Sequence, residues 1–125
     1  MLNVFISLRT KGLTYEEAIA KRDIIAEAFK KEHENYRNEI NIIESLFKDY
    51  DPEECNPIEY LGKSISAMKD ADVVLIPLIE SASSKGCACE FAVAKEYGIP
   101  IKVYATNGLG DVFFIDWRDT HRYVQ

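Results

Sequence analysis

The sequence feature that most constrains the fold is an apolar run followed closely by a helical pattern, in the second half of the chain. The run covers residues 71–79 and is rich in β-branched side chains, which predicts a strand buried on both faces. A serine-rich loop at residues 80–85, with Gly86 at its end, joins it to a segment whose pattern predicts a helix. Ligands of doubly wound α/β folds bind where such strands end and such helices begin. Glu90 falls near the start of the helix, so its carboxylate is expected beside a ligand.

Predicted strands and helices also alternate in the segments before and after this strand and helix. Strands are predicted at residues 2–7, 39–44, 99–104 and 112–115, and helices at residues 14–34 and 57–69. Thr14 and Glu17 form a capping box at the start of the first helix. This order predicts an α/β fold: one flavodoxin-like (Rossmann-like) domain over residues 1–125, a three-layer sandwich around a mainly parallel five-stranded sheet.

The expected strand order 2-1-3-4-5 places the switch point of the sheet between the first and third strands. The loops at residues 7–12 and 80–85 should then face each other across a crevice. Hydroxyls, cations and exposed amides in these loops can hold a phosphate, and the alternative is an ordinary solvated surface. The candidate binding residues in these loops are Ser7, Arg9, Ser83, Ser84, Lys85 and Gly86.

Two roles are open for Glu90. An acid near the start of a helix is stabilised by the helix dipole by about 0.3–1 kcal/mol, and this is sufficient reason for its presence. The same position keeps the carboxylate ionised and directs it into the crevice, where it can act as a nucleophile or an electrostatic stabiliser.

Composition narrows the ligand class and the location. A net charge of −6 disfavours binding of a nucleic-acid polymer, although a local phosphate pocket is compatible with it. No apolar run approaches the roughly 20 residues that span a bilayer, so no membrane partner is expected. The first residues lack the features of a signal peptide and the cysteines are odd in number, which indicates reduced thiols and a cytoplasmic location.

The sequence predicts no metal site and no cofactor. Cys87 and Cys89 lie on the predicted helix and point about 200° apart, so they cannot share a metal. His33 and His121 are both distant in sequence, which makes a Cys–His enzyme improbable. Both cysteines are expected to be small packing residues.

With these residues in place, the chain resembles the nucleoside 2-deoxyribosyltransferase superfamily. It is most similar to small phage and bacterial members of largely unassigned function, which are related to 2′-deoxynucleoside 5′-phosphate N-hydrolases. The resemblance covers residues 3–104 and is most specific in the G-x-A-x-E step that ends at Glu90 and in the later Gly-Ile-Pro. The matching segments are residues 4–7, 12–14, 61–64, 71–74, 86–90 and 97–100.

The resemblance implies an activity and a site. The family glutamate at the position of Glu90 attacks the anomeric carbon of a (deoxy)nucleoside, releases the base and leaves a glycosyl-enzyme that water or another base resolves. The serine at the position of Ser84 binds the 5′-phosphate. The resemblance also implies a homodimer or higher homo-oligomer, and residues 106–114, with Val112, Phe113 and Phe114, are a candidate interface. Alternatively, these residues cover the edge of the sheet.

The chain also departs from the family pattern. The family aspartate falls at Ser64, which remains a substrate-binding candidate, and Phe5 stands where a tyrosine often orients the nucleophile. Glu44, Glu59 and Tyr60 are the candidate substitutes for the second acid. The departure leaves three hypotheses: a nucleotide N-glycosidase or glycosyltransferase, a protein that binds or sequesters a nucleotide signal without cleaving it (for example in phage anti-defence), and an NAD-cleaving domain of the Toll/interleukin-receptor kind.

Overall fold

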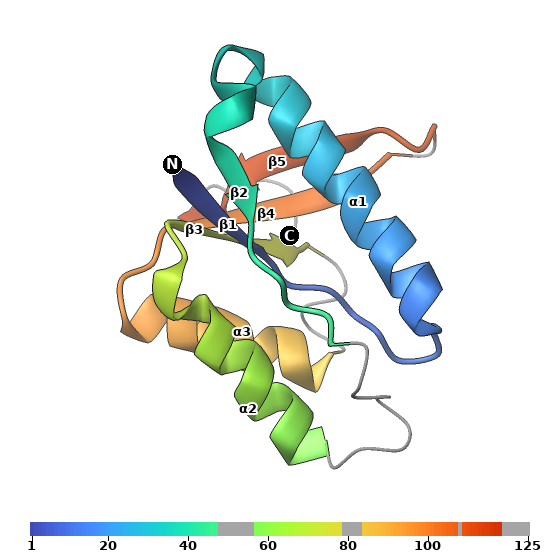
Figure 1. Cartoon of the computed structure of the whole chain (residues 1–125), viewed down its shortest axis with the longest axis vertical. Helices are drawn as coiled ribbons and strands as arrows, with labels where there is room; N and C mark the ends of the chain where they lie inside the picture. The colour runs from blue at the N-terminus through green and yellow to red at the C-terminus, as the bar shows by residue number, and fades with distance from the viewer. Residues whose placement is uncertain (48–56, 79–83, 108, 119–125) are drawn as a thin grey trace.

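A computed structural model describes residues 1–47, 57–78, 84–107 and 109–118. Within them, five strands form one sheet, with α1 on one face and α2 and α3 on the other (Figure 1). The strands are β1 (Leu2–Ile6), β2 (Ile40–Ile42), β3 (Val73–Pro77), β4 (Ile101–Thr106) and β5 (Val112–Asp116). The helices are α1 (Tyr15–Glu32), α2 (Pro57–Ala67) and α3 (Lys85–Glu96), with 3-10 turns η1 (Glu34–Glu39) and η2 (Met68–Asp70).

The strand order β2-β1-β3-β4-β5 confirms the order expected from the sequence. β1 pairs in parallel with β2 and β3, and β3 pairs in parallel with β4, but β5 is antiparallel to β4. The sheet is therefore mixed: the pairs among β2, β1, β3 and β4 are parallel, in keeping with the mainly parallel sheet expected, and only the pairing of β5 with β4 is antiparallel. The physical reason is the short connection at residues 107–111, because a parallel neighbour needs a crossover of a dozen residues or more.

The element boundaries differ from those expected in three places. β2 is shorter than predicted at both ends, because Glu39 belongs to η1 and the strand already ends at Ile42. The helix expected over residues 57–69 ends as α2 at Ala67 and continues as η2. α3 begins at Lys85, so Lys85 and Gly86 belong to its first turn and not to the preceding loop. The Asp51-Pro52 pair, a cap residue before a proline, also predicts a short turn, which lies outside the described residues.

Two apolar clusters hold the layers together, one on each face of the sheet. Val4 and Ile6 of β1 pack with Phe29 of α1, whereas Phe5, which points the other way, packs with Met68 and Ala94 beside α2 and α3. Every residue of β3 is buried, as the apolar run predicts. This alternation fixes the register of β1, because a shift by one residue would exchange its two buried faces.

The β5 residues considered for an interface are only partly exposed. Val112 and Phe114 pack against the cluster beside α1, and the ring of Phe114 meets that of Phe29 edge to face at 5.5 Å between centroids. Phe113 alone of the three is open to solvent, at 40% exposure. Covering the sheet edge therefore accounts for Val112 and Phe114.

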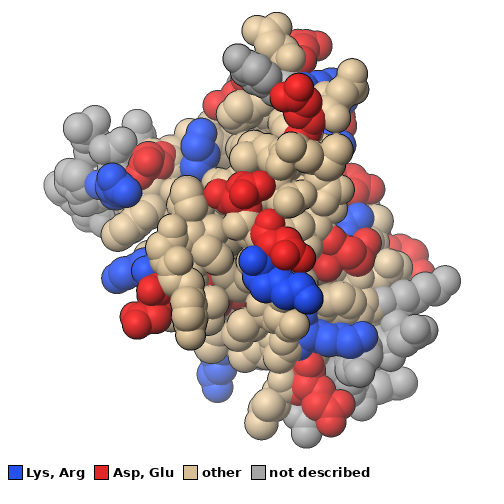
Figure 2. Space-filling model, turned by 60° about the vertical axis from the view of Figure 1, so that its left-hand side comes forward, with Lys and Arg blue, Asp and Glu red and all other residues tan. Residues whose placement is uncertain are grey.

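Acidic and basic side chains are interspersed over the face displayed in Figure 2, where the described residues form no continuous basic surface. Among the described helices, none has the length and apolar character needed to cross a membrane.

Candidate functional site

A pocket of about 490 Å³ lies at the carboxyl end of β1, beside the amino end of α3, and its volume is within the usual range for small-molecule sites. Its wall comes from the loop after β1, the segment after β2, the first half of α2 with Ser64, and the first two turns of α3. The lining residues are Ile6, Leu8, Arg9, Thr10, Lys11, Ser45, Leu46, Ile58, Tyr60, Leu61, Ser64, Ser84, Lys85, Gly86 and Glu90. The pocket therefore brings the loop after β1 together with Ser84 and Lys85, as the predicted crevice requires, while residues 80–83 of the second loop lie outside the described residues.

Glu90 projects from the second turn of α3 and is only 5% exposed, although it lines the pocket. Its Oε1 accepts a hydrogen bond of 2.8 Å from the Ser7 hydroxyl, and its Oε2 accepts one of 2.6 Å from the Ser64 hydroxyl. Three elements thus converge on one carboxylate: the end of β1, the middle of α2 and the start of α3. Such a carboxylate is held in a single orientation.

Opposing effects act on the proton affinity of Glu90. Burial raises the pKa of its carboxyl, because the charged form loses its hydration, and the hydrogen bonds from Ser64 and Ser7 lower it. Burial is the larger effect, so the pKa is raised overall. A buried carboxyl with a perturbed pKa in a pocket wall is a candidate functional group.

Ser7 is itself fixed by neighbouring strands. Its backbone amide donates to the Leu75 carbonyl at 2.8 Å, and its carbonyl accepts a hydrogen bond of 2.7 Å from the hydroxyl of Tyr104 in β4. Sequence reasoning missed Tyr104. The signal was a phenol within an apolar strand, because a buried tyrosine hydroxyl usually requires a partner.

The amino end of α3 forms a second part of the wall. Ser84 is the N-cap, and its hydroxyl oxygen accepts from the Cys87 amide at 3.3 Å. Lys85 and Gly86 follow in the first turn, which contains no acidic residue. Ser84 can still donate its hydroxyl proton to a ligand, because its oxygen is only an acceptor in the cap.

The loop after β1 forms a third part of the wall. Arg9, Thr10 and Lys11 line the pocket, and the Leu13 amide closes a turn on the Thr10 carbonyl at 2.9 Å. Gly12 completes this turn with φ +83°, a conformation that a side chain would disfavour. The loop therefore brings two positively charged side chains to the same pocket as Lys85.

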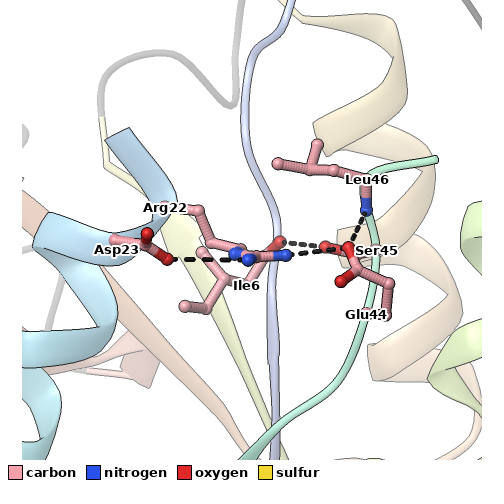
Figure 3. A network of polar contacts seen from close by, with 6 residues as sticks. All are labelled: Ile6, Arg22, Asp23, Glu44, Ser45 and Leu46. Atoms are coloured by element: carbon pink, nitrogen blue, oxygen red, sulfur yellow. Dashed lines mark hydrogen bonds and ion pairs between the residues drawn. The ribbon is translucent and has the colours of Figure 1, made fainter. Parts of the chain in front are cut away.

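The segment after β2 is held against the pocket by a polar network (Figure 3). Arg22 of α1 pairs with Glu44 at 2.8 Å, and the same Glu44 oxygen accepts from the Leu46 amide at 3.1 Å. The hydroxyl of Ser45 donates to the carbonyl of Ile6 at 3.4 Å. These bonds fix Ser45 and Leu46, both of which line the pocket.

The three candidate substitutes for the second acid differ in their position relative to the pocket. Tyr60 lines the pocket, Glu44 is paired with Arg22, and Glu59 is exposed and is not part of the wall. Among the described lining residues, Glu90 is the one carboxylate.

The substrate-binding residues predicted from the sequence fall into three groups, according to their position relative to the pocket. Arg9, Ser64, Ser84, Lys85 and Gly86 line the pocket with Glu90. Ser7 contacts Glu90 without lining the pocket, and Ser83 lies outside the described residues.

The two cysteines of α3 point in different directions, as their spacing predicts. Cys87 is buried, as expected of a packing residue, but Cys89 is exposed, so that expectation is wrong for Cys89, and neither residue lines the pocket. Among the described residues, no group of three or more His, Cys, Asp or Glu side chains is placed to hold a metal ion.

Comparison of the chain with family models, with curated proteins and with solved structures found no match.

Proposed function

We propose that the protein cleaves or transfers the N-glycosidic bond of a (deoxy)nucleoside 5′-monophosphate or a related nucleotide, with Glu90 as the nucleophile. The observation that carries this proposal is a buried carboxylate in a pocket wall, held by two hydroxyls and flanked by a cationic loop and a helix amino end. The strand order, which is that of flavodoxin-like folds, and the resemblance to the nucleoside 2-deoxyribosyltransferase superfamily support it.

In this mechanism the phosphate binds at the amino end of α3, with the hydroxyl of Ser84 and the guanidinium of Arg9. The sugar then lies beside Glu90. A carboxylate oxygen of Glu90 attacks the anomeric carbon, and the C–N bond breaks with its electron pair going to the base, which takes a proton from water. The transition state resembles an oxocarbenium ion, which the carboxylate stabilises.

The second step releases the sugar. Water, or the nitrogen of a second base, attacks the anomeric carbon and gives its proton to solvent, which replaces the proton that the first base took, and the bond to Glu90 breaks with its electron pair returning to the carboxylate. Ser7 and Ser64 each occupy one lone pair of a different oxygen, so a lone pair remains on each oxygen for attack. Their hydrogen bonds also favour the ionised form that a nucleophile requires.

A second candidate function is binding without cleavage. The observation that favours it is that both oxygens of Glu90 already accept protein hydroxyls, while no second carboxylate lines the described part of the pocket. On this alternative, Glu90 organises the pocket and accepts hydrogen bonds from a ligand that is held intact, as in a sequestering protein.

Chromatography of protein incubated with deoxynucleoside and ribonucleoside monophosphates, NAD and cyclic dinucleotides distinguishes the two. Glu90→Gln is the test variant, and Glu59→Gln, an exposed acid of α2 outside the pocket wall, is the matched control. Free base with the wild type and Glu59→Gln, but not with Glu90→Gln, supports cleavage. Recovery of one intact compound from the protein, without free base, rejects cleavage in favour of binding.

A further inference from the structure

Outside β1 and the loop that follows it, the apolar lining of the pocket comes from two elements. The first half of α2 contributes Ile58, Tyr60 and Leu61, and the segment after β2 contributes Leu46. We call these four residues the apolar wall. Leu46 is only 5% exposed, although it lines the pocket. A surface of this kind suits a planar aromatic ring, because burial of apolar area favours the contact.

The segment after β2 contacts α2 directly after Leu46. The ring of Phe47 meets that of Tyr60 edge to face, at 6.0 Å between centroids. The ammonium of Lys63 lies 5.1 Å from the centroid of the Phe47 ring. The two elements of the apolar wall are therefore packed on each other, and the position of Leu46 depends on what holds the segment on its other side.

On that side, the segment is held by one carboxylate oxygen of Glu44 (Figure 3). Oε1 of Glu44 accepts a hydrogen bond of 3.1 Å from the Leu46 amide and one of 2.8 Å from the guanidinium of Arg22 in α1. The backbone of Leu46 is thus tied to α1. None of the described residues that line the pocket belongs to α1, so Arg22 acts on the wall from outside it.

Arg22 is placed unfavourably for a residue that serves stability alone. Its side chain is 14% exposed, and its buried Nε has no hydrogen-bond partner among the described residues. A buried donor without a partner destabilises the folded state, and an ion pair with a carboxylate side chain that is 60% exposed contributes little. The contact with Glu44, and through it with Leu46, gives this guanidinium a different role.

We propose that Arg22 is a positioning residue, which acts through Glu44 to hold Leu46 where the apolar wall binds the base of the ligand. This inference rests on the proposed nucleotide function of the same pocket. With the phosphate at the amino end of α3 and the sugar beside Glu90, the apolar wall is the part of the lining left for the base. Arg22 then affects how tightly the base is held and does not affect the sugar phosphate.

Equilibrium binding by calorimetry tests the inference. The ligands are nucleoside 5′-monophosphates of the common bases, together with ribose 5-phosphate and 2-deoxyribose 5-phosphate, which lack a base. The sugar phosphates are titrated directly or in competition with the tightest monophosphate. The protein carries Glu90→Gln, so that no ligand is consumed.

The test variants are Arg22→Met, Glu44→Gln and the double variant. Glu27→Gln is the matched control, because Glu27 pairs with Arg37 across α1 and η1 and its side chain is 60% exposed, as is that of Glu44. Neither Glu27 nor Arg37 lines the pocket. Urea unfolding midpoints without ligand are measured for every variant.

Arg22→Met and Glu44→Gln should each weaken the tightest monophosphate by about tenfold, and the double variant should lose no more than either one. The sugar phosphates should bind every variant alike, and Glu27→Gln should change neither class of ligand. The unfolding midpoint of Arg22→Met should not fall, because the unpartnered Nε is removed with the charge. A residue that merely supports the fold would instead weaken all ligands together.

Four results would overturn the inference and leave the proposed function standing. They are undiminished monophosphate binding in Arg22→Met, an equal loss for the sugar phosphates, additive losses in the double variant, or a loss of affinity accompanied by a lower unfolding midpoint. Failure of every monophosphate to bind, both to the Glu90→Gln protein and to the unaltered protein, would reject the proposed function as well.

Discussion

The hydroxyl of Tyr104 donates a 2.7 Å hydrogen bond to the backbone carbonyl of Ser7, and the Ser7 side chain in turn donates to Glu90. The phenol comes from β4, two strands away from β1 in the sheet, so β3 lies between the two residues. Both residues are buried, at 5% and 0% exposure, which leaves the Ser7 carbonyl dependent on this partner. Tyr104 therefore acts on the carboxylate through Ser7, as a positioning residue.

Tyr104→Phe removes only the hydroxyl and should destabilise the protein by about 1–3 kcal/mol, because a buried carbonyl loses its partner. Urea unfolding measures the loss. Tyr97→Phe is the matched control. Tyr97 is 77% exposed at the end of α3, so the loss of its hydroxyl should change the free energy of unfolding little. If the two variants unfold alike, the bond to Ser7 does not contribute to stability.

Removal of either serine hydroxyl should raise the pKa of Glu90 further, because each hydrogen bond favours the ionised carboxylate. Ser64→Ala should have the larger effect, since the effect of Ser64 on this pKa exceeds that of Ser7. Carbon-13 NMR titration of the glutamate carboxyls measures the shift directly. Ser66→Ala, an exposed serine of the same helix, is the control. An unchanged titration of Glu90 in Ser64→Ala would mean that the hydrogen bond is not formed in solution.

Stability should depend on pH through Glu90. A carboxyl with a raised native pKa contributes fully below its ordinary value of 4.5, where both folded and unfolded forms are protonated, and this contribution is lost as pH rises through the native pKa. The free energy of unfolding of the wild type should therefore fall, relative to that of Glu90→Gln, as pH rises above 4.5. Paired urea titrations across this range measure the difference. A difference that is flat with pH, like that expected for the exposed Glu59→Gln, would contradict the raised pKa.

The sequence predicted those parts of the fold that depend on local pattern. The β-branched run that becomes β3 and the capping box of Thr14 and Glu17 each permit one interpretation, and both are present. The capping box is formed by bonds of 3.0 and 3.1 Å. The antiparallel direction of β5 could also have been predicted from the sequence, because the connection from β4 to β5 is too short for the crossover that a parallel pair needs.

The contacts around Glu90 could not be predicted in the same way. Ser64 reaches Glu90 because α2 and α3 pack on the same face of the sheet, and the rotation of α2 about its axis depends on buried residues such as Met68. Tyr104 reaches Ser7 across β3, a relation between residues 97 positions apart that no local pattern records. The loops that form the candidate site could therefore be predicted from the sequence. The hydrogen bonds to Glu90 could not, because they depend on how the helices and strands pack.

Gly86 offers a test that separates binding from folding. It lies in the first turn of α3 with a helical backbone, and a Cβ there would meet only the Ser84 hydroxyl, at 4.0 Å. Gly86→Ala should therefore leave stability unchanged or raise it by up to about 1 kcal/mol, the helix preference of alanine over glycine. The added methyl group would nevertheless lie in the pocket wall, beside the backbone amides proposed to bind the phosphate, so ligand affinity should fall.

Gly62→Ala is the matched control for this substitution. Gly62 lies in α2, lacks any atom within 4 Å of a Cβ and is not part of the pocket wall, so it should gain stability without losing affinity. Thermal unfolding and calorimetric titration with the ligand found by chromatography measure both quantities for each variant. Weaker binding in Gly86→Ala alone, with both proteins at least as stable as the wild type, places the ligand at the amino end of α3. Undiminished binding in Gly86→Ala would place it elsewhere in the pocket and would remove the amides of this helix from the proposed phosphate site.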